Sequence, residues 1–392
     1  MPRSFAVVLL SLCLFTVTFA VNLQAPLYSA YTAESAMGAT AVTVAFAAYV
    51  AGLMPTLMLL GGLSDKIGRR IPIIIALILG GIGTLALVVA PGWVSLVVAR
   101  FVLGVGTGLA TTAGTAYMAE IMGERQVKRA ALFVTSATTL GFGGGALLTG
   151  ISLSLQGLTF FPSSFALLFA AVPVLVILAL RLPRCDKPKA VSLLRLPVFP
   201  SRTWPYGAAM GVAWSATGMT IAVVPLELQV HGLGNWTGLV IFLAIFVGFL
   251  CQPLARRLSN PTALGLGFFL VPAGYVALLA GSWSQSILLV LVGAAVTSAA
   301  SYGFSYLAAL SEFSVRAPEN RARATAGLFV YAYVGFSIPV IASGILADRY
   351  GLLQAMGFFG SALLISTLIV VWAWLRSTNV IQPTAVSAET SL

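Results

Sequence analysis

The fold of this chain is indicated by the stretch Gly61-Gly62-Leu63-Ser64-Asp65-Lys66-Ile67-Gly68-Arg69-Arg70. It holds one carboxylate among three cations, in a chain of which only 8% is charged, and it lies between two long apolar runs. Gly61 and Gly68 allow close backbone approach and a sharp turn. The stretch therefore predicts a tight loop between two membrane helices, on the side of the membrane where positive charge collects.

The composition excludes a soluble globular protein. The chain of 392 residues is 59% hydrophobic, and its mean hydropathy is +1.02. A spanning helix needs about 20 apolar residues, so this length accommodates about twelve helices joined by short loops. The apolar runs are continuous rather than alternating, which is typical of helices and not of barrel strands. We therefore expect an all-α membrane protein.

Twelve transmembrane helices are expected from the apolar runs, over residues 4–31, 39–62, 71–90, 93–119, 129–155, 160–182, 204–230, 235–254, 263–280, 284–310, 324–347 and 352–375. All Lys and Arg residues except Arg100 and Arg349 fall in the even-numbered connections or near the two termini. Positive charge marks the cytoplasmic side of a membrane protein. Both termini are therefore expected in the cytoplasm, and a bacterial inner membrane is the expected location. The net charge of +11 reflects topology and does not indicate nucleic-acid binding.

The chain also repeats itself. Gly141-Phe142, Gly150-Ile151 and Gly157-Leu158 recur as Gly335-Phe336, Gly344-Ile345 and Gly351-Leu352, always at a spacing of 335 − 141 = 194 residues. We therefore predict two six-helix halves, residues 1–182 and 204–375, joined by a basic cytoplasmic linker at 183–203. The polar residues 376–392 are expected to form a disordered tail. In such folds the binding site lies near the midplane, between the halves.

The pattern Gly61-x-Leu-x-Asp65-Lys-x-Gly68-Arg69-Arg70 resembles the loop between helices 2 and 3 of the major facilitator superfamily. The resemblance implies alternating access, a monomer, and a cytoplasmic gate. In that gate Asp65 caps the N-terminus of helix 11 and Arg69 pairs with Glu120 at the inner end of helix 4. A carboxylate is stabilised at a helix N-terminus, so Asp65→Asn is expected to impair transport and to leave expression intact.

Two further motifs suggest proton-coupled export. Arg100-x-x-x-Gly104-x-Gly106-x-Gly108 resembles the helix 4 motif of the same superfamily, whose arginine is linked to proton coupling. An arginine inside a membrane helix is a functional candidate by default, and the alternative is an arginine that binds backbone carbonyls for packing. The glycines of the predicted fifth helix resemble an antiporter motif, although they also fit plain helix packing; they are Gly141, Gly145 and Gly150.

Further candidates come from polar and aromatic residues at membrane depth. Glu227, near the outer end of helix 7, is the second candidate for proton coupling, with water-exposed interfacial placement as the alternative. The acid that the resemblance implies in helix 1 is missing, and Val17 stands there. Polar or aromatic side chains that suit a substrate cavity are Asn22, Gln24, Trp214, Tyr302, Tyr306 and Tyr331, of which the aromatic ones equally suit packing.

The expected function is a secondary transporter that exports small lipophilic or amphipathic molecules by proton antiport. One alternative is a symporter or facilitator for a metabolite such as a sugar or an organic anion, with Arg100 binding the anion. Another is a membrane sensor that no longer transports. The chain has one histidine, no metal-ligand spacing and no nucleotide-binding loop, so we expect neither an enzyme nor a cofactor. The expected partners are the substrate, protons and the lipid bilayer.

Overall fold

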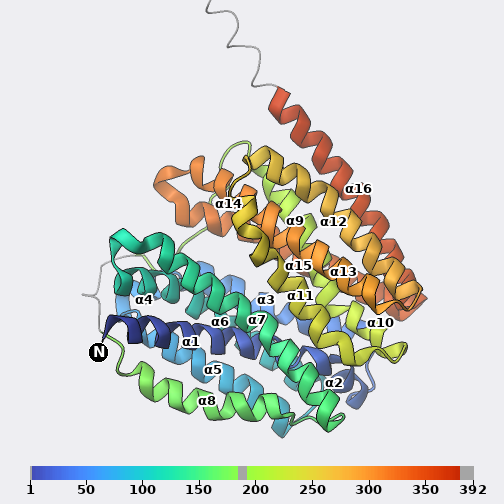
Figure 1. Ribbon diagram of the computed structural model, residues 1–392, viewed down its shortest axis with the longest axis horizontal. Helices are drawn as coiled ribbons and strands as arrows, with labels where there is room; N and C mark the ends of the chain where they lie inside the picture. Colours follow the sequence, from blue (N-terminus) through green and yellow to red (C-terminus); the bar gives the residue numbers. More distant parts are fainter. Residues whose placement is uncertain (1, 184–191, 380–392) are drawn as a thin grey trace, which may run out of the picture.

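The computed structural model describes residues 2–183 and 192–379, and all regular structure in these residues is helical (Figure 1). In chain order the elements are α1 (Arg3–Asn22), η1 (Ala25–Leu27), α2 (Tyr28–Glu34), α3 (Ala39–Leu59), α4 (Leu63–Ile67), α5 (Arg70–Val89), α6 (Trp93–Met122), η2 (Glu124–Gln126), α7 (Val127–Gln156), α8 (Ser163–Ala179), α9 (Trp204–Ala222), α10 (Val224–Val230), η3 (Gly234–Trp236), α11 (Thr237–Ala255), α12 (Asn260–Trp283), α13 (Ile287–Ser298), η4 (Ala299–Ser305), α14 (Tyr306–Val315), η5 (Pro318–Asn320), α15 (Arg321–Tyr350) and α16 (Leu352–Asn379).

The number of membrane crossings agrees with the prediction. Eleven helical segments of the described chain are long and apolar enough to cross a membrane, and α8 is a shorter apolar helix of 17 residues. A bilayer-spanning helix contains about 17–25 residues, so α8 is at the lower limit. Large apolar side chains such as Ile82, Phe269 and Ile369 are more than half exposed, as lipid-facing residues are. The chain is a multi-pass membrane protein.

Several helix ends differ from the predicted ones. Residues 61–70 are not one loop, because they contain the short helix α4, which ends at Ile67 and is followed by Gly68 with φ +88°. α8 is shorter than the predicted 160–182, because it begins after Pro162 and ends before Leu180. α6, α14 and α15 extend beyond the apolar residues into charged ones, since a helix backbone does not stop where polarity rises. α16 continues to Asn379, so the first residues of the predicted disordered tail are helical, and residues 380–392 lie outside the described residues.

Both halves begin with a helix that is broken at the same place. α1 ends at Asn22, just before Pro26-Leu27, and α9 ends at Ala222, just before Pro225-Leu226. Proline has no N–H and cannot continue the helical hydrogen bonds. The Pro-Leu pair that occurs in both halves therefore corresponds to a helix break in each of them.

The halves meet along two pairs of helices, α3 with α15 and α7 with α11. Figure 1 shows the first half in blue to green and the second in yellow to red, side by side. We call the end that holds α4 and residues 192–203 the basic end, and the end that holds residues 35–38 and 351 the distal end.

Part of the predicted linker lies between α3 and α15 at the basic end. The Gly62 N–H donates to Leu193 O at 3.1 Å, and the Arg195 N–H donates to Met58 O at 2.8 Å. A few residues later the Val198 N–H donates to Arg323 O at 3.0 Å. Residues 193–198 thus bind the end of α3 and the start of α15 at once. Residues 184–191 of the predicted linker lie outside the described chain.

Candidate functional site

A cavity of about 280 Å³ lies between the two halves. The first half lines it from α1, α3, α6 and α7, and the second half lines it from α9, α11, η4, α14 and α15. Its position between the halves agrees with the site predicted from the sequence repeat. Small-molecule sites in proteins measure about 300–1,000 Å³, so this cavity suits a small solute rather than a bulky one.

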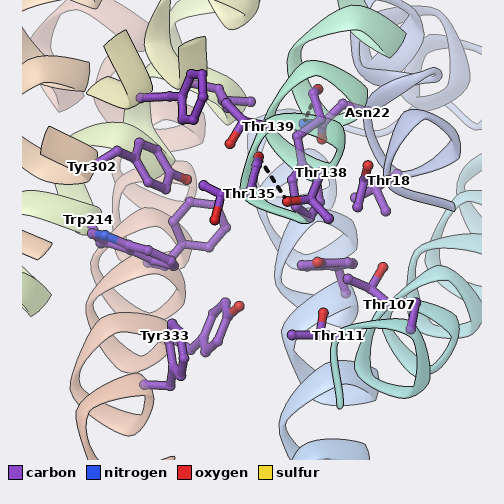
Figure 2. Close-up of a pocket in the computed structure, with 18 of the residues that line it drawn as sticks. Thr18, Asn22, Thr107, Thr111, Thr135, Thr138, Thr139, Trp214, Tyr302 and Tyr333 are labelled. Carbon is purple, nitrogen blue, oxygen red and sulfur yellow. Dashed lines mark hydrogen bonds between the residues drawn. The ribbon is translucent and has the colours of Figure 1, made fainter. Parts of the chain in front are cut away.

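The two walls of the cavity differ in chemistry. Figure 2 shows threonines and Asn22 of the first half facing Trp214, Tyr302 and Tyr333 of the second half. The hydrogen-bonding residues of the first half are Thr18, Asn22, Tyr49, Arg100, Thr107, Thr111, Thr115, Thr135, Thr138 and Thr139, and this half also contributes the rings of Phe46 and Phe142. The aromatic residues of the second half are Trp214, Phe249, Tyr302, Tyr306, Phe329, Tyr333 and Phe336.

Arg100 is buried in the wall of the first half, with 1% of its surface exposed. Its Nη1 donates to Val21 O at 2.8 Å and its Nη2 donates to Phe46 O at 3.2 Å. α1 ends one residue after Val21, so that carbonyl lies in a last turn where intrahelical partners are lacking. The guanidinium carbon lies 4.8 Å from the ring centre of Tyr49, which adds cation–π attraction. Arg100 therefore fastens α6 to α1 and α3.

The aromatic wall is organised around Trp214. Its ring centre lies 5.1 Å from that of Tyr302, 5.4 Å from that of Tyr333 and 5.8 Å from that of Phe336. Tyr302 belongs to η4, a π-helical segment, and such segments occur frequently at functional sites. The Trp214 Nε1 is buried and has no hydrogen-bond partner among the described residues. The wall thus presents flat apolar rings, and the Trp214 Nε1 lies behind them, away from the cavity (Figure 2).

Most of the residues predicted for a substrate cavity lie at this cavity. Asn22, Trp214, Tyr302 and Tyr306 line the cavity, as does Arg100. The prediction is wrong for two other residues. Gln24 is fully buried, and its Nε2 donates to Val21 O in the turn that follows α1.

Tyr331 is the second wrong assignment. Its ring packs against Gly207 of α9 and lies 5.8 Å from the ring of Phe199. Tyr333 lines the cavity instead. Two residues along a helix differ by about 200° in direction, so Tyr331 and Tyr333 cannot both face one cavity.

The threonines of α6 and α7 were not singled out from the sequence. Thr107, Thr111 and Thr115 are four residues apart and share one face of α6. Thr135 and Thr139 have the same spacing on α7. A polar stripe at this spacing inside an apolar run is the signal that would have found them.

Glu227 lies outside the cavity, on α10 toward the distal end. Its side chain is 5% exposed, and the Nδ1 of His231 lies 3.4 Å from its Oε1. Glu227 and Asp65 are the buried acidic side chains of the described chain, and Glu227 is the one without an arginine partner. The two candidates for proton coupling, Arg100 and Glu227, are therefore not brought together.

At the basic end an ion-pair network surrounds Asp65. Arg69 Nη2 lies 2.6 Å from Asp65 Oδ1, and Arg69 Nε lies 3.0 Å from Glu120 Oε1, as predicted for that pair. The other oxygen of Asp65 binds Arg195 of the linker at 2.9 Å. The prediction that Asp65 caps helix 11 is wrong for this conformation, because the linker arginine occupies the carboxylate.

Comparison with known proteins agrees with this architecture. The sequence profile of the Major Facilitator Superfamily matches residues 10–338. The chain belongs to the major facilitator superfamily. The fold and the loop around Asp65 are thus those of this superfamily of transporters.

Solved transporter structures superpose on 96% of this chain. A point mutant of the nucleoside transporter NupG gives a TM-score of 0.76 at 13% identity, over 96% of this chain and 100% of that one. A bacterial homologue of the human lysosomal transporter Spinster, inward-facing and unoccupied, gives 0.71 at 15% identity, over 96% and 97%. Its occupied inward-facing form gives 0.70 at 14% identity, with the same coverage. At these identities the likeness shows the superfamily fold alone.

At the distal end the halves of this superfamily fold are joined by Asp348. Its Oδ1 accepts from the Ala39 N–H at 2.7 Å and its Oδ2 accepts from the Thr40 N–H at 3.0 Å. These N–H groups open α3 and have no intrahelical partner. The N-cap residue, Gly38, has no side chain of its own to cap them, and a Cβ there would overlap the Asp348 carboxylate. The second half therefore caps a helix of the first.

The glycines of α7 allow close packing on both sides of that helix. A Cβ at Gly141 or Gly145 would overlap the backbone of α1, and one at Gly150 would press on Gly238 of α11 in the other half. Gly150 thus lies at the contact between the halves near the distal end. This agrees with the packing explanation of the helix 5 motif and does not by itself assign antiport.

Proposed function

We propose that the protein exports small amphipathic molecules from the cytoplasm by proton antiport with alternating access. The basic end is then cytoplasmic, in accordance with the positive-inside rule. The distal end is closed by the contacts of Asp348 with α3 and of Gly150 with Gly238. Substrate enters the cavity between the halves from the basic end and leaves when the distal contacts separate.

The observation that carries proton coupling is the burial of Glu227 while the distal end is closed. α10, which holds Glu227, contacts α2 of the first half at this end. Removing an ionised carboxylate from water costs far more than removing a neutral acid. Closure of the distal end therefore favours a protonated Glu227, and opening toward the more acidic exterior gives that proton its entry.

Because Glu227 lies outside the cavity, proton and substrate do not compete for one site. They compete through the conformation instead: each shifts the equilibrium between the two open states by its different affinity for them. The proton favours the distal-closed state, whereas export requires the substrate-loaded protein to open the distal end. Coupling also requires that the proton taken up from the exterior is released to the cytoplasm before the distal end reopens, and the proton gradient can then drive export.

The test is proton movement evoked by substrate in proteoliposomes that enclose a pH dye. With an acidic lumen, addition of a transported compound outside should make the lumen more alkaline. Glu227→Gln mimics the neutral acid and should abolish this proton movement while labelled substrate still equilibrates. Glu34→Gln, at an exposed acid of the same end, is the control and should behave as the wild type. Proton movement that survives Glu227→Gln would refute this assignment.

A second candidate is a symporter or facilitator for a metabolite such as a sugar or an organic anion. No aspartate or glutamate lines the cavity within the described residues, and the cavity wall holds the cation Arg100. This favours solutes that are not cationic. Substrate accumulation with acidification of the lumen would support symport, and equilibration without proton movement would support a facilitator.

A further inference from the structure

We infer that the substrate is an uncharged ring compound that carries several hydroxyl groups, of the sugar or small-glycoside class. The inference deepens the proposed function and rests on the cavity between the halves being the substrate site. It follows from the unlike walls of that cavity, from their free hydrogen-bonding groups, and from their charge.

Apart from the buried Arg100, the wall of the first half offers uncharged hydrogen-bonding groups. Thr111, Thr135 and Thr139 have side-chain hydroxyls with no hydrogen-bond partner among the described residues. Thr18 and Thr138 donate to carbonyls of their own helices, which leaves their oxygens as acceptors toward the cavity. A solute with several hydroxyl groups satisfies both kinds of threonine, because each of its hydroxyls donates and accepts.

Asn22 adds an acceptor to this wall. Its Nδ2 donates to Phe142 O at 2.9 Å, so the amide oxygen remains for the cavity. An apolar solute would leave these groups unsatisfied, and each buried unsatisfied group weakens binding.

The wall of the second half is a set of aromatic faces. Trp214, Tyr302 and Tyr333 present rings to the cavity on the side opposite the threonines (Figure 2). The C–H face of a pyranose and the face of an aromatic aglycone both bury apolar surface against such rings. An open-chain polyol has no flat face for this wall, so a ring compound is favoured.

The charges of the cavity select against ions. No carboxylate of the described chain lines it, so a cationic solute would have only cation–π contacts with the rings, against the repulsion of Arg100. The cation Arg100 is 1% exposed, and two of its five N–H donors bind backbone carbonyls. An anionic solute would have to open the packing around this buried guanidinium to reach it. A neutral solute pays neither penalty.

The test is equilibrium binding of labelled phenyl β-glucoside to the purified full chain in nanodiscs, without any gradient. We expect it to bind at least tenfold more tightly than methyl glucoside, phenyl glucuronide or benzyltrimethylammonium. Thr111→Val removes one lining hydroxyl at constant shape and should raise Kd by about threefold to tenfold. The control is Thr112→Val on the same helix, whose hydroxyl donates to Gly108 O and which does not line the cavity.

Tighter binding of the cation or of the glucuronide than of phenyl glucoside would overturn the inference, as would equal Kd values for Thr111→Val and Thr112→Val. This outcome is separable from the outcome for export. If the glucoside binds but evokes no proton movement in liposomes, antiport fails and the substrate class stands. If lipophilic cations evoke proton movement and the glucoside does not bind, antiport stands and the substrate class fails.

Discussion

Arg100 is a structural anchor as much as a cavity residue. Its two terminal nitrogens bind carbonyls on two different helices, Val21 O on α1 and Phe46 O on α3. A lysine has one compact ammonium group and cannot reproduce this planar fork. Arg100→Lys should therefore destabilise the protein by about 2 kcal/mol, since a hydrogen bond to a charged group contributes about 1.5–3 kcal/mol.

Thermal unfolding in detergent, followed by intrinsic fluorescence, measures this effect. The matched control is Arg70→Lys, because Arg70 also donates to one carbonyl, Leu180 O, but at an exposed position. The melting temperature of the Arg70→Lys protein should differ from that of the wild type no more than is usual for a neutral surface substitution. Equal melting temperatures for Arg100→Lys and the wild type would mean that Arg100 does not anchor α6.

Asp65 holds two arginines at the basic end, and Asp65→Asn removes both ion pairs at once. We expect normal expression and a transport rate lowered by about tenfold, which corresponds to about 1.4 kcal/mol in an activation barrier. Arg195→Ala removes only the pair to a partly exposed arginine and should lower the rate less. Uptake assays at matched protein amounts compare the two. A larger loss for Arg195→Ala would contradict this ranking.

Individual site residues could be predicted from the sequence only where the residue type is unusual for its surroundings. Arg100 is such a residue, because a cation inside an apolar membrane helix is energetically costly and is rarely found there without a function. Tyr331 and Tyr333 are alike in composition and in surroundings along the chain, and only the rotation of α15 separates them. The threonines of α6 and α7 were missed because a threonine inside a membrane helix commonly satisfies its hydroxyl on its own backbone.

At the scale of helices, the cap of α3 by Asp348 links the two halves through one carboxylate. Asp348→Ala removes the cap and should shift the equilibrium toward an open distal end by about fivefold, since a cap contributes about 1 kcal/mol. Asp348→Asn keeps an acceptor oxygen and should shift it less. The measurement is the distance between spin labels at Met37 and Tyr350, which flank the contact. A label distance unchanged in Asp348→Ala would show that this cap does not keep the distal end closed.

Helix ends were the least predictable feature of the elements. The apolar runs located every crossing, because burial in lipid requires them. They did not locate α4 or the polar ends of α6 and α14, since backbone hydrogen bonds continue where apolar character ends. The path of residues 193–198 between α3 and α15 was also beyond prediction. It depends on backbone groups such as the Gly62 N–H and Arg323 O, which carry no residue-specific signal.

At the scale of the whole molecule, two similar halves enclose one cavity whose walls differ in chemistry. The two-half architecture was predictable from the 194-residue repeat and the alternation of positive charge. The difference between the walls was not, because it arises only when the threonine face of one half meets the aromatic face of the other. Two identical halves would give two identical walls. The difference between the walls therefore shows that the two halves have diverged in sequence at the cavity.

The central claim is that a proton on Glu227 and closure of the distal end favour one another. The most direct measurement is a pair of spin-label distances, Met37 to Tyr350 at the distal end and Lys66 to Arg321 at the basic end. The labels require a background in which the three native cysteines are replaced. Both distances are compared at about pH 5 and about pH 8, a range in which aspartates such as Asp348 stay ionised.

The sign of the expected change follows from burial. Closure of the distal end buries Glu227, and a neutral acid is buried at lower cost than a carboxylate, so acid should favour that state. From about pH 8 to about pH 5 the distal distance should shorten and the basic-end distance should lengthen. Glu227→Gln should remove this response. Distances that stay constant, change in the same direction, or respond equally in Glu227→Gln would contradict proton-coupled alternating access.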